Sequence, residues 1–311
     1  MPETYLLNRD AEETRRLNEQ HKVYVTYISP TIDSTTILQL TNFDPYASKY
    51  SHLTDHLHSS LGYEIHPTAT ASLPPNATIA DIGTGTGIWL LDIARTNPSY
   101  VLHGFDISAA QIHPDFNSSS NLHFHLSDFK QPFPPELLGT FDLVHARLLI
   151  FALQAEEWAP AVANLTTLLK PGGYLQWEEI NPAPATYVLR TKPTASTTVF
   201  QGELNTMLGS GEAIVQSASQ VLGLLRDGFG KSLVDVKTDV VSSEREISQR
   251  GAATKVMVGV VVGALKQRMA SGKEVLDEER VERVKKDMAR EVESGAYLQF
   301  YVHCFVGRKE G

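Results

Sequence analysis

The sequence of 311 residues contains one cysteine, no long apolar run and no excess of basic residues. A lone cysteine, Cys304, excludes a network of intrachain disulfides and is typical of a reducing compartment. The first twenty residues are charged throughout and lack the apolar stretch that a secretory signal needs. We therefore expect a cytoplasmic protein.

The longest apolar run covers residues 256–265 and is flanked by Lys255 and Lys266. Ten helical residues rise about 15 Å, half the hydrocarbon thickness of a bilayer, so no membrane span is predicted. Gly259 and Gly263 have the GxxxG spacing. Outside a span of about 20 apolar residues, this spacing favours a buried helix that allows close backbone approach, and a homodimer contact is the alternative.

The net charge of −9 argues against a nucleic-acid substrate, because nucleic-acid-binding proteins normally present a basic stripe and none is visible here. His52, His56 and His58 lie close together, but no cysteine or closely spaced trio of carboxylates completes a metal site. We therefore expect no metal and a small molecule as the binding partner.

Strands and helices alternate between residues 77 and 180, which predicts a parallel sheet in an α/β fold. Strands are expected over 77–82, 100–105, 122–126, 141–146 and 174–178, with helices over 88–95 and 158–169. Residues 181–200 resemble a loop, 203–225 a helix, 233–241 a sixth strand and 297–306 a seventh, with two helices between the last two strands. This division predicts a helical cap over 1–72 and an α/β core over 73–311, with a helical insertion at about 243–294.

The most informative stretch is a glycine loop that follows the first strand. Gly83, Gly85 and Gly87 alternate after Asp81, so the chain can turn sharply and a ligand can approach bare backbone. A dinucleotide fingerprint would need glycine at position 88, where Ile88 stands, and no lysine of a P-loop follows. The spacing favours a nucleoside ligand without a pyrophosphate.

Two further acids follow the next strands. Asp106 ends the second strand and can accept hydrogen bonds from both hydroxyls of a ribose. Asp128 follows the third strand, where it could accept from the exocyclic amine of adenine while Phe129 covers the ring. Ligands of open α/β sheets bind at the carboxyl ends of the strands, and these acids and Asp81 all fall there.

With these residues in place, the chain resembles class I S-adenosylmethionine (SAM)-dependent methyltransferases. It is most similar to the fungal group that serves secondary metabolism and includes a velvet-complex regulator. The matching segments are IADIGTGTGIWLLDIA, LHGFDIS, FDLVHARLL, LLKPGGYLQWEE and AYLQFYVHCFVGRK.

The resemblance implies SAM as cofactor and a Rossmann-like, seven-stranded, mostly parallel sheet whose last strand is antiparallel. The glycines would underlie the methionine portion, Asp106 would hold the ribose and Asp128 the adenine, and Asp81 would engage the amino-acid end through water. The N-terminal segment and the helical insertion would cap the acceptor site. The candidate cofactor residues are Asp81, Gly83, Thr84, Gly85, Gly87, Asp106, Ile107, Asp128 and Phe129.

Candidate catalytic residues lie at the ends of the fourth and fifth strands. His145 and Arg147 share one face by the two-residue period. His145 could be a base near neutral pH, or it could support the cofactor loop. Arg147 could orient an anionic acceptor, or pair with Asp142 or Glu179. Of Glu178 and Glu179, one could be a base and the other a structural partner.

The leading hypothesis is methyl transfer to an oxygen or nitrogen of a small acceptor, such as a polyketide, peptide-derived or alkaloid intermediate. Oxygen is slightly favoured, because such acceptors are frequent in the group that the chain resembles. A SAM-binding cyclase or pericyclase that moves no methyl group is an alternative. A methyltransferase-like regulator is a third, although the complete glycine loop and both acids argue against a pure scaffold.

Overall fold

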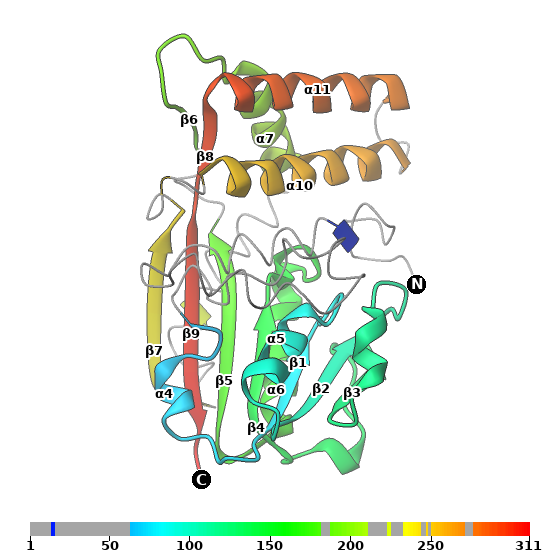
Figure 1. Cartoon of the computed structure of the whole chain (residues 1–311), viewed down its shortest axis with the longest axis vertical. Helices are drawn as coiled ribbons and strands as arrows, with labels where there is room; N and C mark the ends of the chain where they lie inside the picture. The colour runs from blue at the N-terminus through cyan, green and yellow to red at the C-terminus, as the bar shows by residue number, and fades with distance from the viewer. Residues whose placement is uncertain are drawn as a thin grey trace, which may run out of the picture.

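The computed structural model describes residues 14–15, 63–181, 187–210, 223–224, 233–243, 247, 250–270 and 276–311. In these parts, a seven-stranded sheet flanked by helices forms the lower body, and a smaller lobe of helices lies above it (Figure 1). Most of the predicted cap over 1–72, including the three clustered histidines at 52, 56 and 58, lies outside the described residues, so the cap stays a prediction.

The large sheet has the strand order β3-β2-β1-β4-β5-β9-β7. Its strands are β1 (Thr78–Ile82), β2 (Val101–Asp106), β3 (Leu122–Leu126), β4 (Phe141–Arg147), β5 (Leu169–Asn181), β7 (Leu233–Ser242) and β9 (Tyr301–Lys309). Strands β1 to β5 pair in parallel, whereas β9 runs antiparallel to both of its neighbours. The predicted Rossmann-like sheet with an antiparallel last strand is therefore confirmed. Its order reverses between β1 and β4, the position where such sheets bind ligands.

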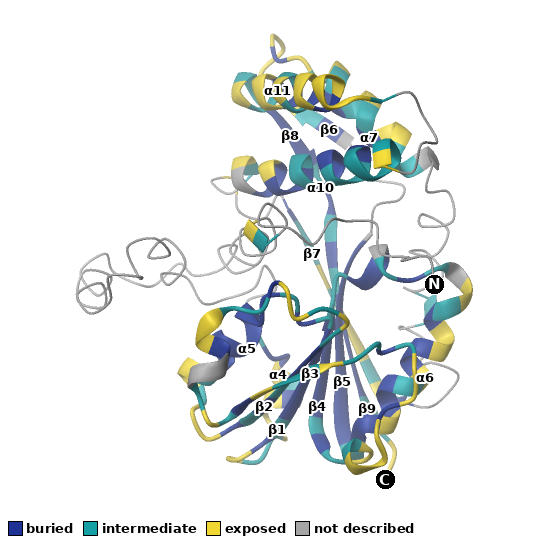
Figure 2. Ribbon diagram, turned by 90° about the vertical axis from the view of Figure 1, so that its right-hand side faces the viewer, coloured by how far each residue is buried: buried dark blue, intermediate teal, exposed yellow. Residues whose placement is uncertain are grey.

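Helices α5 (Ile88–Thr96) and α6 (Trp158–Leu168) lie on opposite faces of this sheet (Figure 2). Alternate residues of β1 serve the two layers: Ile79 belongs to the cluster that contains the apolar residues of α5, and Ala80 and Ile82 belong to the cluster that contains those of α6. A parallel sheet covered on both faces needs apolar residues in near-continuous runs, which is the composition of β1. The short helix α4 (Pro67–Thr70) contributes Ala69 to the α5 layer.

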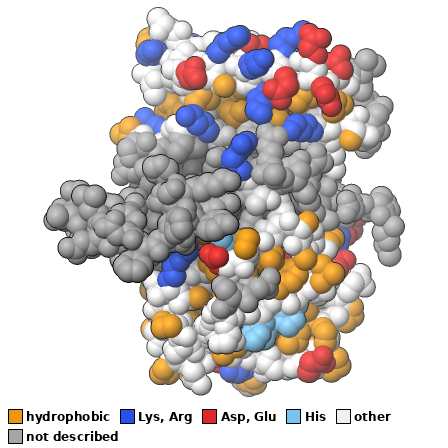
Figure 3. Space-filling model, turned by 45° about the vertical axis from the view of Figure 1, so that its right-hand side comes forward, with side chains coloured by type: hydrophobic (Ala, Val, Ile, Leu, Met, Phe, Trp, Pro, Cys, Tyr) orange, Lys and Arg blue, Asp and Glu red, His pale blue; other side chains and the backbone are white. Residues whose placement is uncertain are grey.

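The upper lobe is built on a second sheet of two strands, β6 (Tyr187–Arg190) and β8 (Ala296–Gln299). Its helices are α7 (Thr198–Ser210), α10 (Arg250–Ala270) and α11 (Glu278–Ser294). The two helices predicted between the last strands are thus present as α10 and α11. Helix α11 buries Val281, Val284 and Met288, while charges of both signs cover its outer face (Figure 3). This is the solvated, mixed-charge helix that its sequence pattern indicates.

Helix α10 carries the longest apolar run of the sequence and packs against α7, α11 and β8. Val260, Val261 and Leu265 are buried, and Gly259 and Gly263 are half-buried. The run therefore serves the interior of the lobe. Within the described residues, no helix combines the length and apolar character that crossing a bilayer requires.

Two predicted elements are wrong. Residues 181–200 contain β6 and the start of α7, and the strand expected over 297–306 is divided at Phe300 into β8 and β9, which belong to different sheets. At the division, the backbone N–H of Ser243 donates to the carbonyl of Phe300 at 2.9 Å, and the Ser243 Oγ accepts from the Phe300 N–H at 3.0 Å. This partner is distant in sequence, so the local alternation pattern does not reveal the break.

Candidate cofactor site

The glycine loop between β1 and α5 requires its glycines. Gly83, Gly85 and Gly87 have φ values of +67°, +58° and +75°, the left-handed region that glycine adopts without strain. A Cβ at Gly87 would lie 2.4 Å from the ring of Phe116, and one at Gly83 would lie 2.6 Å from Leu149 Cδ2. Any side chain at these two positions would disturb both the turn and its neighbours.

Asp106 pins this loop to the end of β2. The Gly85 N–H donates to Asp106 Oδ2 at 2.9 Å, and the Ser108 N–H donates to Oδ1 at 3.0 Å. The N–H groups of Gly83 and Thr84 both donate to the carbonyl of Phe105. Each carboxylate oxygen accepts more than one hydrogen bond, so Asp106, which is half-buried, can still receive hydroxyl groups.

Gly104 is part of this site although the sequence reasoning missed it. It lies in β2, and a Cβ there would come within 2.9 Å of Thr84 Cγ2 and 3.1 Å of Phe116 Cζ. The glycine therefore leaves the room in which the loop packs onto the strand. A glycine inside a strand often marks such a close approach, so the sequence itself contains a signal for Gly104.

The predicted adenine side of the site lies after β3. Asp128 is half-buried, and its Oδ1 accepts from the Lys130 N–H at 3.0 Å. The side chain of Ile107 is 46% exposed beside Asp106 and is free to cover a ring. Phe129 is buried in the core cluster on the α6 face, so its contact with a ligand stays a prediction.

Asp81 lies beneath the loop and is buried. Its Oδ2 accepts from Thr84 Oγ1 at 2.7 Å, and its Oδ1 lies 2.7 Å from Nδ1 of His145. Asp81 thus supports the loop from inside the protein. Its predicted water-mediated contact with the amino-acid end of the cofactor stays a prediction.

His145 lies on β4 and is 0% exposed. Its ring stacks on Trp89 of α5 with centroids 3.8 Å apart, and its Nε2 lies 3.8 Å from Glu178 Oε1. Burial alone would lower the pKa of His145, but Asp81 and Glu178 outweigh it and the pKa is raised. Of the two interpretations that the sequence left open, this geometry favours support of the cofactor loop over a base for the acceptor.

Glu178 and Glu179 are both buried and have different surroundings. Burial alone would raise the pKa of Glu178, but His145, the charge of Arg147 and the amide of Gln176 outweigh burial and lower it. Glu178 is therefore an ionised carboxylate beside His145 and Arg147, and it is as deeply buried as His145.

Glu179 faces the turn that follows β4. Its carboxyl accepts from the N–H of Ile180 at 3.2 Å and interacts with the N–H groups of Leu149 and Ile150, in the 3₁₀ helix η4 (Leu149–Phe151). Burial raises the pKa of Glu179 to about 8. Leu148, just before η4, has a φ of +56°, a strained value for leucine that surrounding contacts must maintain. Glu179 is thus the structural partner that holds this turn.

Arg147 ends β4 and is half-buried, and its charge acts on Glu178. Asp142, one of the partners that the sequence offered for Arg147, lies at the opposite end of β4. There it binds Lys170 Nζ and the Thr78 N–H, each at 2.8 Å. The predicted pairing of Arg147 with Asp142 is therefore wrong, because the two residues lie at opposite ends of a strand of seven residues.

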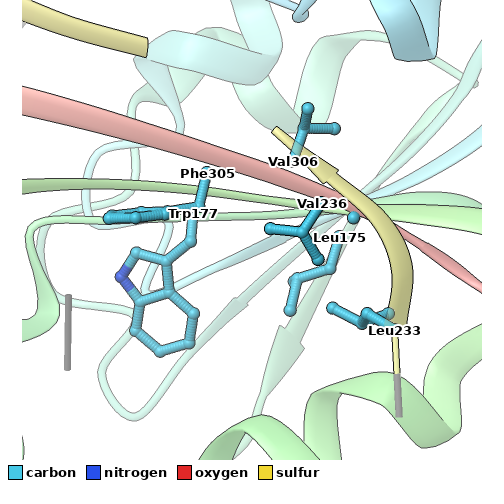
Figure 4. Close-up of a pocket in the computed structure, with 7 residues that line it drawn as sticks. Leu175, Trp177, Leu233, Val236, Phe305 and Val306 are labelled. Atoms are coloured by element: carbon cyan, nitrogen blue, oxygen red, sulfur yellow. The ribbon is translucent and has the colours of Figure 1, made fainter. Parts of the chain in front are cut away.

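A small apolar pocket lies elsewhere, between β5, β9 and the amino end of β7 (Figure 4). It is lined by Leu175, Trp177, Leu233, Val236, Phe305, Val306 and Gly307. This lining offers no charged or hydroxyl side chain to orient adenosine or an acceptor. The candidate site therefore remains at the carboxyl ends of β1, β2 and β4.

Comparison with known proteins identifies the class to which this site belongs. Residues 53–207, about half of the chain, match the family described as a methyltransferase domain. The chain therefore belongs to the methyltransferases, and the resemblance that the glycine loop predicts is confirmed.

Several relatives are fungal proteins. The methyltransferase grgD of a Penicillium species is 34% identical over 185 residues, 57% of this chain and 52% of grgD. The N-methyltransferase sirN of Leptosphaeria maculans is 33% identical over 179 residues, 57% of this chain and 50% of sirN. The secondary metabolism regulator laeA of Monascus pilosus is 32% identical over 114 residues, 36% of this chain and 29% of laeA. The chain thus spans about half the length of the first two relatives.

Among solved structures, phosphoethanolamine N-methyltransferase 2 of Haemonchus contortus in complex with S-adenosyl-L-methionine aligns with 91% of this chain and 61% of its own, at 12% identity and a TM-score of 0.45. The methyltransferase domain itself implies SAM as cofactor. The residues present fit it: side-chain-free backbone at Gly83, Gly85 and Gly87 can receive the methionine portion, and Asp106 offers acceptors to a ribose.

Proposed function

We propose that this protein is a SAM-dependent N-methyltransferase that acts on a small-molecule acceptor of secondary metabolism. The observation that supports the proposal is the junction of the glycine loop with Asp106 on a methyltransferase domain, where the loop backbone and the Asp106 carboxylate suit a nucleoside. Two relatives, sirN and gliN, are named N-methyltransferases, which favours nitrogen over the oxygen preferred from the sequence. The net charge of −9 favours a small acceptor over a nucleic acid.

Methyl transfer from SAM depends more on the alignment of donor and acceptor than on strong acids or bases. When bound, SAM supplies a methyl group on a sulfonium, whose departure leaves a neutral thioether. Positioning of two reactants can lower a barrier by about 7–11 kcal/mol. In this chain, Asp106 and the glycine loop would orient the donor from the ends of β2 and β1. The acceptor would then approach from the side of β4, which is the other neighbour of β1.

The turn after β4 is our candidate for the acceptor wall. Leu149, the first residue of η4, packs against the backbone of Gly83, so this turn adjoins the cofactor loop directly. Glu179 holds the turn from below, and Arg147 stands at its start. We propose that η4 excludes water from the reacting atoms and that Arg147 orients a polar group of the acceptor.

The proposal is tested by incubating the protein with SAM and amine-containing metabolites, followed by mass spectrometry. We expect products heavier by one methyl group together with stoichiometric S-adenosylhomocysteine. Product without S-adenosylhomocysteine would contradict methyl transfer and favour the cyclase alternative.

The cofactor site is tested separately by Asp106→Ala. Removal of the carboxylate leaves ribose hydroxyls without acceptors, so SAM binding should weaken by about 2–3 kcal/mol in calorimetry. Asp287→Ala, on α11 in the upper lobe, is the matched control and should bind SAM as the wild type does. An Asp106→Ala variant with unaltered affinity would remove Asp106 from the site.

A further inference from the structure

A row of polar side chains crosses the sheet on the face covered by α5. It comprises Thr84, Asp81, His145, Glu178 and Gln176, all of them buried. The strand register places Asp81 opposite His145 and His145 opposite Gln176. Charged groups are costly to bury unless they pair, so the two carboxylates of this row favour a positive charge beside them.

The row consists of two hydrogen-bonded parts, which the ion pair of His145 and Glu178 joins. Thr84 Oγ1 donates to Asp81, Asp81 lies 2.7 Å from His145 Nδ1, and His145 Nε2 lies 3.8 Å from Glu178 Oε1. Gln176 Nε2 donates to the same Glu178 oxygen at 2.9 Å. The row therefore runs from the glycine loop on β1 to the middle of the sheet on β5.

His145 lies between the two carboxylates of this row. Asp81 faces it from β1 and Glu178 from β5, while α5 contributes the uncharged indole of Trp89. The charge of Arg147 also acts on Glu178. Two buried carboxylates beside one imidazole favour its doubly protonated form, in which Nδ1–H points to Asp81 and Nε2–H to Glu178.

We propose that His145, as an imidazolium, is a positioning residue that locks Asp81 and Thr84 and thereby holds the glycine loop in the shape that binds the methyl donor. This inference rests on the proposed function, since it assigns the loop to SAM. His145 acts through Asp81 and does not itself touch the reacting atoms.

The same row also reaches the segment that enters the sheet from the N-terminal side. Gln176 Oε1 accepts from the His66 N–H at 2.7 Å, and Gln176 Nε2 donates to the carbonyl of Glu64 at 2.9 Å. Residues 64–66 and the glycine loop are thus attached to the two ends of the same row.

The consequence is a pH dependence of cofactor affinity with a defined sign. Asp81 and Glu178 raise the pKa of His145, so we expect the imidazolium to lose its proton only as the pH becomes alkaline. At alkaline pH, loss of the Nε2 proton would leave a lone pair facing the Glu178 carboxylate and weaken the hold on Asp81. Affinity for S-adenosylhomocysteine, measured by calorimetry from about pH 6 to about pH 10, should stay level and then fall about tenfold with a one-proton slope.

Two variants separate this role from simple packing. His145→Asn keeps an N–H donor toward Asp81 but no charge, so it should bind S-adenosylhomocysteine about tenfold more weakly at neutral pH and show no alkaline fall. Glu178→Gln removes the carboxylate beside Nε2 and should move the fall to lower pH. His123→Gln, at an exposed site on β3, is the control and should reproduce the wild-type curve.

An alkaline fall in His145→Asn that matches the wild type would overturn the inference. If His145→Asn does not fold, the inference is tested with Glu178→Gln and with the side-chain nitrogen resonances of wild-type His145 in NMR spectra. A neutral His145 ring at pH 7 would also overturn the inference. Wild-type protein that binds no S-adenosylhomocysteine at any pH would instead contradict the proposed function.

Discussion

At the scale of single residues, three histidines on β2 and β3 form a second titratable group, away from the cofactor loop. His103 lies opposite His123 in the register, and its Nδ1 is 2.8 Å from Nε2 of His125. Histidine side chains are visible together on this flank of the molecule (Figure 3). Burial, followed by the neighbouring imidazoles, lowers the pKa of His103 to about 4, and burial lowers that of His125. Both are therefore neutral at pH 7.

This group should make the fold sensitive to acid. Between about pH 6.5 and about pH 4, the unfolded chain binds protons on His103 and His125 that the folded chain refuses, so stability falls as the pH falls. In thermal unfolding followed by circular dichroism, the melting temperature of His103→Gln should decrease less across this pH range than that of the wild type. His113→Gln, outside the group, should keep the wild-type slope. Parallel slopes for all three proteins would show that His103 does not contribute.

Residue by residue, the sequence predicts best where a local pattern decides the role. Gly83 and Gly85 are recognisable because the turn itself demands glycine, and Asp106 because it ends a strand at a fixed distance from that turn. The roles of His145 and Glu178 depend on which side chains surround them, and Trp89 from α5 stacks on the ring of His145. Burial by a distant element leaves no signal in the residue's own segment.

At the scale of elements, a carboxylate from one helix of the upper lobe stabilises the start of another. Glu291 of α11 is buried, and its oxygens accept from the N–H groups of Val199 at 3.1 Å and Phe200 at 2.8 Å, in the first turn of α7. The first amides of a helix have no partner within the helix and carry a partial positive charge. Glu291 satisfies them from a position 91 residues away in sequence.

We predict that Glu291→Gln destabilises the protein by about 1–3 kcal/mol, because the new amide N–H₂ would face helix amides that need an acceptor. Urea unfolding measures the change. Glu293→Gln is the matched control, since Glu293 is exposed two residues further along the same helix and should have little effect. Equal midpoints for the two variants would mean that the cap contributes nothing to stability.

Helices and strands are predictable where short strands and helices alternate along the chain. The positions of β1, β2 and β4 and of helices α5 and α6 follow from local periodicity and turn residues. The divided β8–β9 pair and the short β6 did not, because each is defined by a partner far along the chain. Strand pairing is a property of two segments, and one segment alone does not specify it.

At the scale of the whole molecule, the two lobes share one apolar core. A single cluster of buried residues includes Val260 and Met288 from the upper lobe together with Ile82, Val144 and Trp177 from the sheet. The chain also passes between the lobes through β8 and β9, which only Phe300 separates. A continuous core favours cooperative unfolding, in which neither lobe melts without the other.

The three tryptophans allow this to be tested, because Trp89, Trp158 and Trp177 all lie in α5, α6 and β5 of the lower body. Met288→Ala should create a cavity in the upper lobe, where Met288 is 0% exposed, and cost about 2–5 kcal/mol. If the lobes unfold together, tryptophan fluorescence and far-ultraviolet circular dichroism should shift by the same amount.

Lys286→Ala, at an exposed position on the same helix, controls for loss of side-chain contacts at the surface and should leave both transitions in place. A Met288→Ala protein whose circular dichroism shifts while its fluorescence transition stays unchanged would show that the upper lobe melts independently. The shared cluster would then be a contact between two separately stable units. In that case a change in the upper lobe would leave the sheet that carries the glycine loop intact.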